Sequence, residues 1–160
     1  MNNNVLTIEQ ASKTSRKLKE KGKKIVLVGG CFDILHVGHL EFLKLSKKNG
    51  DILIIALESD KRVTYLKGTQ RPINSQSIRA DNLANLSVVD YVITLPYFEK
   101  DYDYEALVKG LEPDIIAVTK PDRIFDIKKK YADMVGGKVV EVMNRNINYS
   151  TTNIAQGLKL

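Results

Sequence analysis

The chain of 160 residues is 43% hydrophobic and 28% charged, a balance typical of one folded domain (1–160) and unlike that of a disordered or fibrous chain. Its single cysteine cannot form an internal disulfide, which argues against a secreted disulfide scaffold and predicts a reducing, cytoplasmic location. No apolar run reaches the roughly 20 residues of a membrane span and the N-terminus lacks a signal-peptide layout, so no membrane partner is expected, while the net charge of +6 favours an anionic ligand.

Helical patterns and short apolar runs alternate along the chain. The first helix is expected to open at Thr7, where Gln10 completes a capping box, and to end near Lys21 because Gly22 follows. Further helices are predicted at about 37–48, 75–86, 104–111, 125–134 and 151–159. Each predicted strand is a near-continuous apolar run, as is typical of strands buried on both faces of a parallel sheet. The strands are expected at 24–28, 51–57, 91–95, 114–118 and 138–142.

This alternation predicts an α/β fold, a doubly wound, Rossmann-like parallel sheet of about five strands with helices on both faces. In such sheets, ligands bind outside the carboxyl ends of the strands, where the strand order reverses. The basic residues between 13 and 24 have no interleaved aromatic side chains, so we interpret them as a solvated helix face and expect no nucleic-acid partner.

Segment 29–39, GGCFDILHVGH, follows the first predicted strand and runs into the second predicted helix. Gly29 and Gly30 allow a sharp turn and the close approach of a ligand, and the free amides at a helix start attract phosphate. His36 and His39 lie three positions apart on the first helical turn, so both imidazoles can donate hydrogen bonds to one anion. The segment therefore predicts a phosphate site.

Other interpretations of this segment have less support. Any one of its features alone is typical of a structural turn or helix start. The segment lacks the Gly-x-Gly-x-x-Gly of dinucleotide-binding folds and the Gly-Lys-Ser/Thr of phosphate-loop hydrolases. A zinc site is disfavoured because the two histidines have no evident third ligand. Cys31 invites interpretation as a nucleophile, since a thiol at a helix start can have a lowered pKa.

Segment 30–39 resembles the signature of the cytidylyltransferase-like nucleotidyltransferases, whose mark is His-x-Gly-His. Three further stretches resemble the adenylyltransferase domain of the bacterial enzymes that make ADP-heptose. They are Ser59-Asp60, segment 67–74 (KGTQRPIN) followed by Arg79, and segment 145–152 (RNINYSTT), in which an arginine precedes a Ser-Thr-Thr helix start. The lead-in at 6–28 is similar too, so the resemblance covers nearly the whole chain in order.

One stretch departs from that family pattern. Where the heptose enzymes carry a Lys-Gly-Gly-Asp-Tyr turn, this chain has VTKPDR at 118–123. The aspartate of the family turn matches Asp122 only with a one-residue shift. Because this loop lies near the nucleotide in the family, the base preference and the acceptor sugar stay open, whereas the residues that bind phosphate are retained.

The resemblance implies direct in-line transfer, in which an acceptor phosphate oxygen attacks the α-phosphorus of a nucleoside triphosphate and pyrophosphate leaves without a covalent enzyme intermediate. The residues that it implies as catalytic are His36, His39, Lys67 and Arg145. It implies nucleotide binding by Gly30, Cys31, Phe32, His36, Gly38, His39, Asp122, Arg145, Ser150, Thr151 and Thr152. It implies acceptor binding by Asp33, Lys67 and Arg79. Two alternatives stay open, because Arg79 can instead form a surface salt bridge and Asp33 can orient a histidine or cap the turn.

The function that the resemblance implies is transfer of AMP from ATP to a small phosphorylated acceptor such as heptose 1-phosphate. The alternatives are a CTP-dependent cytidylyltransferase for glycerol 3-phosphate or a similar alcohol phosphate, and a non-catalytic nucleotide- or nucleic-acid-binding module. Mg²⁺ is expected to accompany the triphosphate, with no metal site built by the protein, because no carboxylate cage is evident. The sugar kinase often fused to this domain is expected to be a separate protein, and a homodimer stays open.

Overall fold

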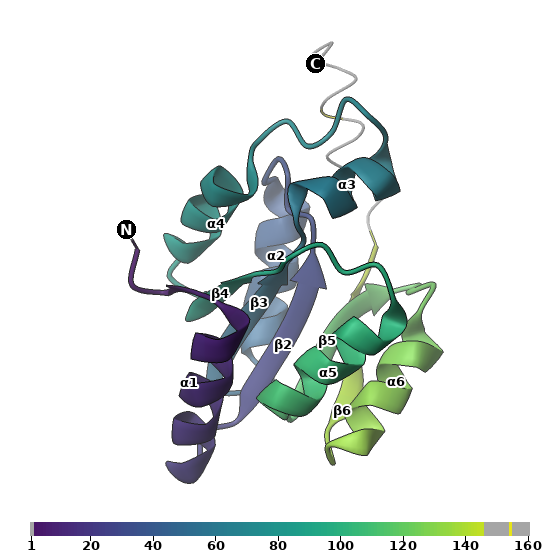
Figure 1. Cartoon of the computed structure of the whole chain (residues 1–160). Helices are drawn as coiled ribbons and strands as arrows, with labels where there is room; N and C mark the ends of the chain where they lie inside the picture. The colour runs from purple at the N-terminus through teal and green to yellow at the C-terminus, as the bar shows by residue number, and fades with distance from the viewer. Residues whose placement is uncertain (1, 146–153, 155–160) are drawn as a thin grey trace.

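The computed structural model describes residues 2–145 and 154, and its six described strands form one parallel sheet (Figure 1). The strands are β1 (Val5–Leu6), β2 (Ile25–Gly30), β3 (Ile52–Leu57), β4 (Tyr91–Thr94), β5 (Ile115–Lys120) and β6 (Lys138–Asn144). Their order in the sheet is β1-β4-β3-β2-β5-β6. The strand order therefore reverses at β2, which pairs with β3 on one side and with β5 on the other.

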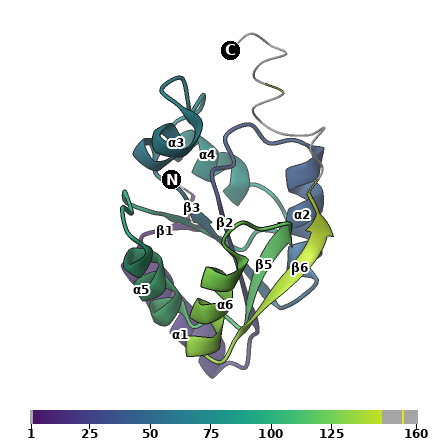
Figure 2. The ribbon, with the colours of Figure 1, turned by 90° about the vertical axis from the view of Figure 1, so that its right-hand side faces the viewer.

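Helices cover both faces of the sheet (Figures 1 and 2). They are α1 (Ile8–Glu20), α2 (Val37–Lys47), α3 (Asp60–Lys67), α4 (Gln76–Ala84), α5 (Asp101–Leu111) and α6 (Phe125–Met134). The core on one face joins α1, α5 and α6 to alternate strand residues such as Ile25 and Leu27. The core on the other face joins α2 and α4 to the intervening residues such as Val26 and Val28. Figure 1 shows α3 beyond the carboxyl ends of the strands, which is where the sequence predicts ligand binding.

The predicted doubly wound α/β fold is confirmed, with one strand more than the five expected. All five predicted strands are present, and β2, β5 and β6 each continue two residues beyond the predicted end. The sixth strand, β1, has two residues and pairs with β4, so it is too short to produce a recognisable pattern. Helix α3 was also missed, because only Val63 of its eight residues is buried and a polar helix carries no apolar period.

The ends of α1 follow the predicted chemistry. The Thr7 hydroxyl accepts a hydrogen bond from the Gln10 N–H, the Gln10 side chain accepts one from the Thr7 N–H, and both capping bonds are therefore present. Gly22, with a φ of +72°, adopts the left-handed backbone that terminates the helix. Of the helix predicted at 151–159, the described part is Ile154, which is helical. None of the described helices is both long and apolar enough to span a membrane.

Candidate functional site

The predicted phosphate segment lies at the carboxyl end of β2, at the point of strand reversal. His36 is the N-cap of α2, and its Nδ1 accepts hydrogen bonds from the N–H groups of Gly38 at 3.1 Å and His39 at 3.4 Å. Because Nδ1 accepts, the hydrogen of the neutral imidazole is on Nε2, which remains as the donor. The sequence predicted that His36 donates from the first helical turn. The structure places it one residue earlier, where it also organises the helix start.

The two histidine rings stack, with centroids 3.8 Å apart and an interplanar angle of 24°. Burial, followed by the neighbouring His36, lowers the pKa of His39 to about 4, although hydrogen bonding to the Ile34 backbone opposes this shift. Burial also lowers the pKa of His36. Both imidazoles are therefore neutral at pH 7. We call His36 and His39 the histidine pair.

Gly30 packs closely against another residue of its own loop. A Cβ at this position would lie 2.8 Å from Cε2 of Phe32, whose ring covers the glycine. Phe32 itself has a φ of +46°, which is uncommon for a bulky residue, and its ring lies 5.2 Å from that of His39. The space beside Gly30 is thus occupied by Phe32, a use that the sequence interpretation did not foresee.

Asp33 is 2% exposed, and its carboxylate binds the turn that follows α3. It accepts hydrogen bonds from Arg71 Nε at 2.8 Å and from the N–H groups of Ile73 at 2.7 Å and Asn74 at 2.9 Å. Burial favours the neutral acid, but the Asn74 and Ile73 amides and the Arg71 guanidinium outweigh it and lower the pKa of Asp33. Asp33 therefore links its own loop to the turn after α3. Its binding of the acceptor stays a prediction.

The Arg79 side chain is fully buried and reaches four acceptors. Its guanidinium donates to the carbonyl oxygens of Asn74 at 3.0 Å, Cys31 at 2.6 Å and Glu58 at 3.0 Å, and to the Asp60 carboxylate at 2.7 Å. The alternative of a salt bridge is present in another form, because the buried Arg79 guanidinium pairs with the exposed Asp60 carboxylate. Acceptor binding by Arg79 stays a prediction, although four of its hydrogen bonds go to protein groups. We call Asp33, Arg71 and Arg79 the clamp.

Cys31 and Lys67 lie near each other at this edge of the sheet. Burial, and then the Glu58 carboxylate, raise the pKa of the Cys31 thiol, whereas Lys67 and two arginines lower it to a smaller extent. A raised pKa leaves the thiol protonated at pH 7, unlike that of an activated nucleophile. The exposed Lys67 ends α3, and its catalytic role stays a prediction.

The remaining predicted residues follow β5 and β6. The backbone N–H of Arg145 donates to Lys120 O at 2.8 Å, which ties the ends of the two strands together, and the Arg145 side chain is exposed. The Asp122 carboxylate accepts from the Ile124 N–H at 2.8 Å and from Lys128 Nζ at 2.6 Å. Ser150, Thr151 and Thr152 lie outside the described residues. The structure thus brings Arg145 and Asp122 to the same sheet edge as the histidine pair.

Sequence interpretation missed one polar cluster at this edge. Glu58 follows β3 directly, and its Oε1 accepts a hydrogen bond from the Tyr104 hydroxyl at 2.8 Å. Arg62 lies with its guanidinium carbon 5.9 Å from the centre of the Tyr104 ring. Burial raises the pKa of Glu58, although Tyr104, Arg62, Arg79 and Lys128 all oppose this. A charged residue directly after a buried strand is a signal that could have identified Glu58.

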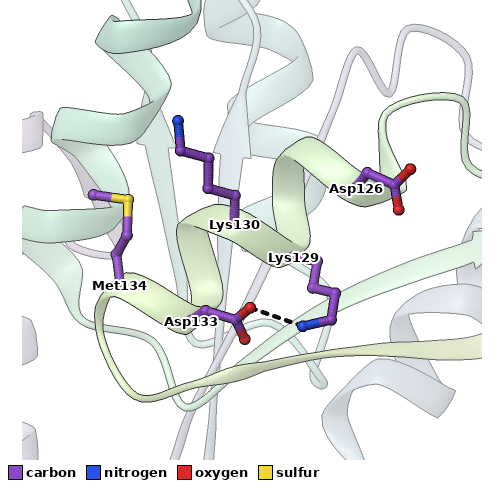
Figure 3. Close-up of a pocket in the computed structure, with 5 residues that line it drawn as sticks. All are labelled: Asp126, Lys129, Lys130, Asp133 and Met134. Atoms are coloured by element: carbon purple, nitrogen blue, oxygen red, sulfur yellow. Dashed lines mark hydrogen bonds and ion pairs between the residues drawn. The ribbon is translucent and has the colours of Figure 1, made fainter.

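A shallow hollow of about 480 Å³ opens elsewhere, on α6 (Figure 3). It is lined by Asp126, Lys129, Lys130, Asp133 and Met134. Lys129 and Asp133 form an ion pair of 2.7 Å across one turn of the helix. None of the predicted site residues lines this hollow.

Known proteins resemble this chain over most of its length. The cytidylyltransferase-like family model matches residues 27–157. The bifunctional protein HldE of Aliarcobacter butzleri is 46% identical over 115 residues, which are 72% of this chain and 23% of that protein. The protein of the same name from Haemophilus ducreyi is 37% identical over 158 residues, which are 97% of this chain and 32% of that protein. The chain thus spans about a quarter to a third of the length of these relatives.

Solved structures show the same architecture. The lipopolysaccharide core biosynthesis protein of Thermoplasma volcanium superposes with a TM-score of 0.65 and 28% identity, covering 78% of this chain and all of that one. Pantoate-beta-alanine ligase of Francisella tularensis superposes with a TM-score of 0.62 at 16% identity, covering 97% of this chain and 76% of that one, which shows a shared fold. With its His-x-Gly-His segment at the strand reversal and the family model matching most of its length, the chain belongs to the cytidylyltransferase-like family of nucleotidyltransferases.

Proposed function

We propose that this protein transfers AMP from ATP to a small phosphorylated sugar such as heptose 1-phosphate and releases pyrophosphate. The observation that carries this proposal is the His36 side chain, which caps α2 through Nδ1 and thereby keeps Nε2–H as a donor beside His39. The resemblance of segment 67–74 to the ADP-heptose enzymes supports ATP as the donor nucleotide. The similarity to a lipopolysaccharide core biosynthesis protein supports a sugar acceptor.

The histidine pair would bind the triphosphate as neutral donors. Because burial lowers both pKa values, the imidazoles need not gain or lose a proton during the reaction. Their hydrogen bonds, together with the positive end of the α2 dipole, would stabilise the charge that develops on the departing pyrophosphate. Deleting one such donor typically costs roughly 3 to 4 kcal/mol of transition-state stabilisation.

Cationic side chains at the same edge would complete the charge balance. We assign Lys67 to the transferring phosphate and to the acceptor, and Arg145 to the transferring phosphate and the nucleotide. Ser150, Thr151 and Thr152, where the sequence predicts a helix start, would bind the β and γ phosphates. The clamp fixes the loop at 29–39 that leads to the histidine pair, since Asp33 in this loop accepts a hydrogen bond from the Ile73 N–H and Arg79 donates to the Cys31 carbonyl.

Mg²⁺ would enter with the triphosphate and be bound by phosphate oxygens and water. Among the described residues, no three histidine, cysteine, aspartate or glutamate side chains gather closely enough to hold a metal ion. When bound, the ion would neutralise part of the charge on the leaving pyrophosphate.

A CTP-dependent reaction with an alcohol phosphate such as glycerol 3-phosphate is the second candidate. The observation in its favour is the loop at 118–123, which departs from the heptose pattern and in which Asp122 is bound to Lys128 and the Ile124 amide. A base that lies against this loop would meet a different surface from the one in the heptose enzymes.

Pyrophosphate release tests the two candidates directly. The protein with Mg²⁺ is combined with ATP, CTP, GTP or UTP and, in turn, with heptose 1-phosphate, mannose 1-phosphate or glycerol 3-phosphate. We expect the highest kcat/KM for ATP with heptose 1-phosphate. A preference for CTP with glycerol 3-phosphate would select the second candidate, and no release from any pair would contradict nucleotidyl transfer to these acceptors.

A further inference from the structure

The cluster of Glu58, Tyr104 and Arg62 lies directly beside segment 29–39, which we call the phosphate loop. The Glu58 N–H donates to the Gly30 carbonyl at 3.0 Å, and the carbonyls of Glu58 and Cys31 both accept from the Arg79 guanidinium. The Arg79 guanidinium therefore links the backbone at Cys31 to the backbone at Glu58. These bonds fix the Glu58 backbone on the β3 side of the loop. The histidine pair lies on the α2 side of the same loop.

The Glu58 carboxylate is held in place, but only one of its two oxygens has a hydrogen-bond partner among the described residues. Tyr104 donates to Oε1 at 2.8 Å, and its ring is anchored by an edge-on contact with Phe98 at 5.0 Å. Oε2 is buried and has no hydrogen-bond partner among the described residues, and the same is true of Arg62 Nε. Native proteins rarely bury charged groups in this state without a functional reason. Neither group has a part in the phosphate chemistry described above.

In-line displacement decides which substrate meets this cluster. The attacking oxygen and the leaving pyrophosphate lie on opposite sides of the transferred phosphorus. If the histidine pair and α2 hold the pyrophosphate, the acceptor approaches from the side of β3 and α3, where Glu58 and Lys67 lie. The phosphate of the acceptor then meets Lys67, and the remainder of the acceptor meets Glu58.

We propose that Glu58, oriented by Tyr104, is a specificity-determining residue that favours acceptors with neutral hydroxyl groups and rejects acceptors with a second anionic group. This inference rests on the proposed function. A fixed, partly desolvated carboxylate repels a second anion at close range, whereas it tolerates a hydroxyl group. Arg62 lies beside the same tyrosine and opposes this repulsion with its positive charge. The two side chains therefore set the selectivity in opposite directions.

Two acceptors that differ in one group test this. Mannose 1-phosphate and mannuronic acid 1-phosphate share the ring and the phosphate, but the second carries a carboxylate in place of a hydroxymethyl group. Calorimetry measures their binding to the full chain saturated with Mg²⁺ and α,β-methylene-ATP, which cannot transfer AMP. We expect the wild type to bind the uronic acid at least about tenfold more weakly. Glu58→Gln should bring the two dissociation constants within about threefold, and Arg62→Gln should widen the difference.

Controls separate charge selection from general damage. Glu105→Gln removes a carboxylate from α5 that pairs with Lys109, and it should leave the ratio unchanged. Tyr104→Phe retains the ring but frees Glu58, so the ratio should fall partway. An unchanged ratio in Glu58→Gln with a normal unfolding transition would overturn the proposal, as would the absence of measurable binding of either acceptor to the wild type. Turnover with heptose 1-phosphate tests the proposed function separately, so the two can fail independently.

Discussion

The histidine pair and the clamp lie next to each other, and every residue of the two groups except Arg71 was a predicted site residue, but their side chains make different contacts in the structure. Asp33 and Arg79 are buried, and their polar atoms bind loop amides, carbonyls and charged side chains. His36 and His39 are partly buried, and His36 commits one ring nitrogen to the helix start while the other remains a donor. The clamp residues therefore hold the protein together, whereas His36 keeps one ring nitrogen that makes no hydrogen bond to the helix start. Variants of the two groups should therefore fail in different ways.

The largest expected effect is a loss of stability when the clamp is broken. Arg79→Met leaves the carbonyls of Cys31, Glu58 and Asn74 without their donor and removes the partner of Asp60. We expect the free energy of unfolding to fall by about 3 to 5 kcal/mol. Urea denaturation measures this, with the exposed Arg16→Met as a control that should change it by less than about 0.5 kcal/mol. A loss in Arg79→Met as small as in the control would show that the clamp does not hold the loop.

The histidine pair should fail in activity rather than in stability. Asparagine at position 36 can still cap α2 but lacks the distal N–H donor, so His36→Asn should lower kcat/KM by about 10²-fold or more with little change in unfolding. His36→Ala should lose the same activity and, in addition, about 1 kcal/mol of stability, because the cap is lost. Steady-state kinetics and urea denaturation of both variants separate these effects. Near-normal turnover in His36→Asn would contradict the assignment.

The two groups should also respond to pH in different ranges. The unfolded chain protonates His39 near pH 6.5 and the native protein only near pH 4, so the unfolded state binds more protons between these values and stability falls as the pH falls. We expect a loss of roughly 1 to 2 kcal/mol between pH 7 and pH 5. The lowered pKa of Asp33 confines the loss from the clamp to pH below about 4. Denaturation at both pH values should show a smaller decrease in His39→Gln than in the wild type, and an equal decrease would contradict the buried, neutral His39.

Cys31 should give the smallest effect, because the direct reaction needs its backbone and not its sulfur. Burial and Glu58 raise the thiol pKa, and Arg79 binds its carbonyl oxygen. Cys31→Ser should therefore retain kcat/KM within about tenfold. Alkylation of the wild-type thiol with a bulky reagent should inhibit, and saturating MgATP should protect. Complete loss of turnover in a folded Cys31→Ser variant, together with a nucleotidyl adduct on the wild-type thiol, would show that the transfer is not direct.

Regular elements could be predicted wherever a local pattern was long enough. The Thr7 capping box and Gly22 defined both ends of α1, and the apolar runs located the five longer strands, because these signals depend on neighbouring residues alone. Helix α3 and strand β1 were missed, because a polar helix and a two-residue strand have no such local pattern. The extra residues at the ends of β5 and β6 come from pairing between the two strands, which includes a register shift after Val118.

The sequence by itself determined the alternating α/β fold through short-range periodicity, and it indicated the family through the resemblance of the His-x-Gly-His segment and three further stretches. The tertiary structure decided which atoms of that motif remain for a ligand. A side-chain donor can be used by an acceptor far along the chain. Arg79 donates to Cys31, 48 residues away, and Tyr104 donates to Glu58, 46 residues away. Such pairings form only when the sheet brings the strand ends together, so no local pattern records them.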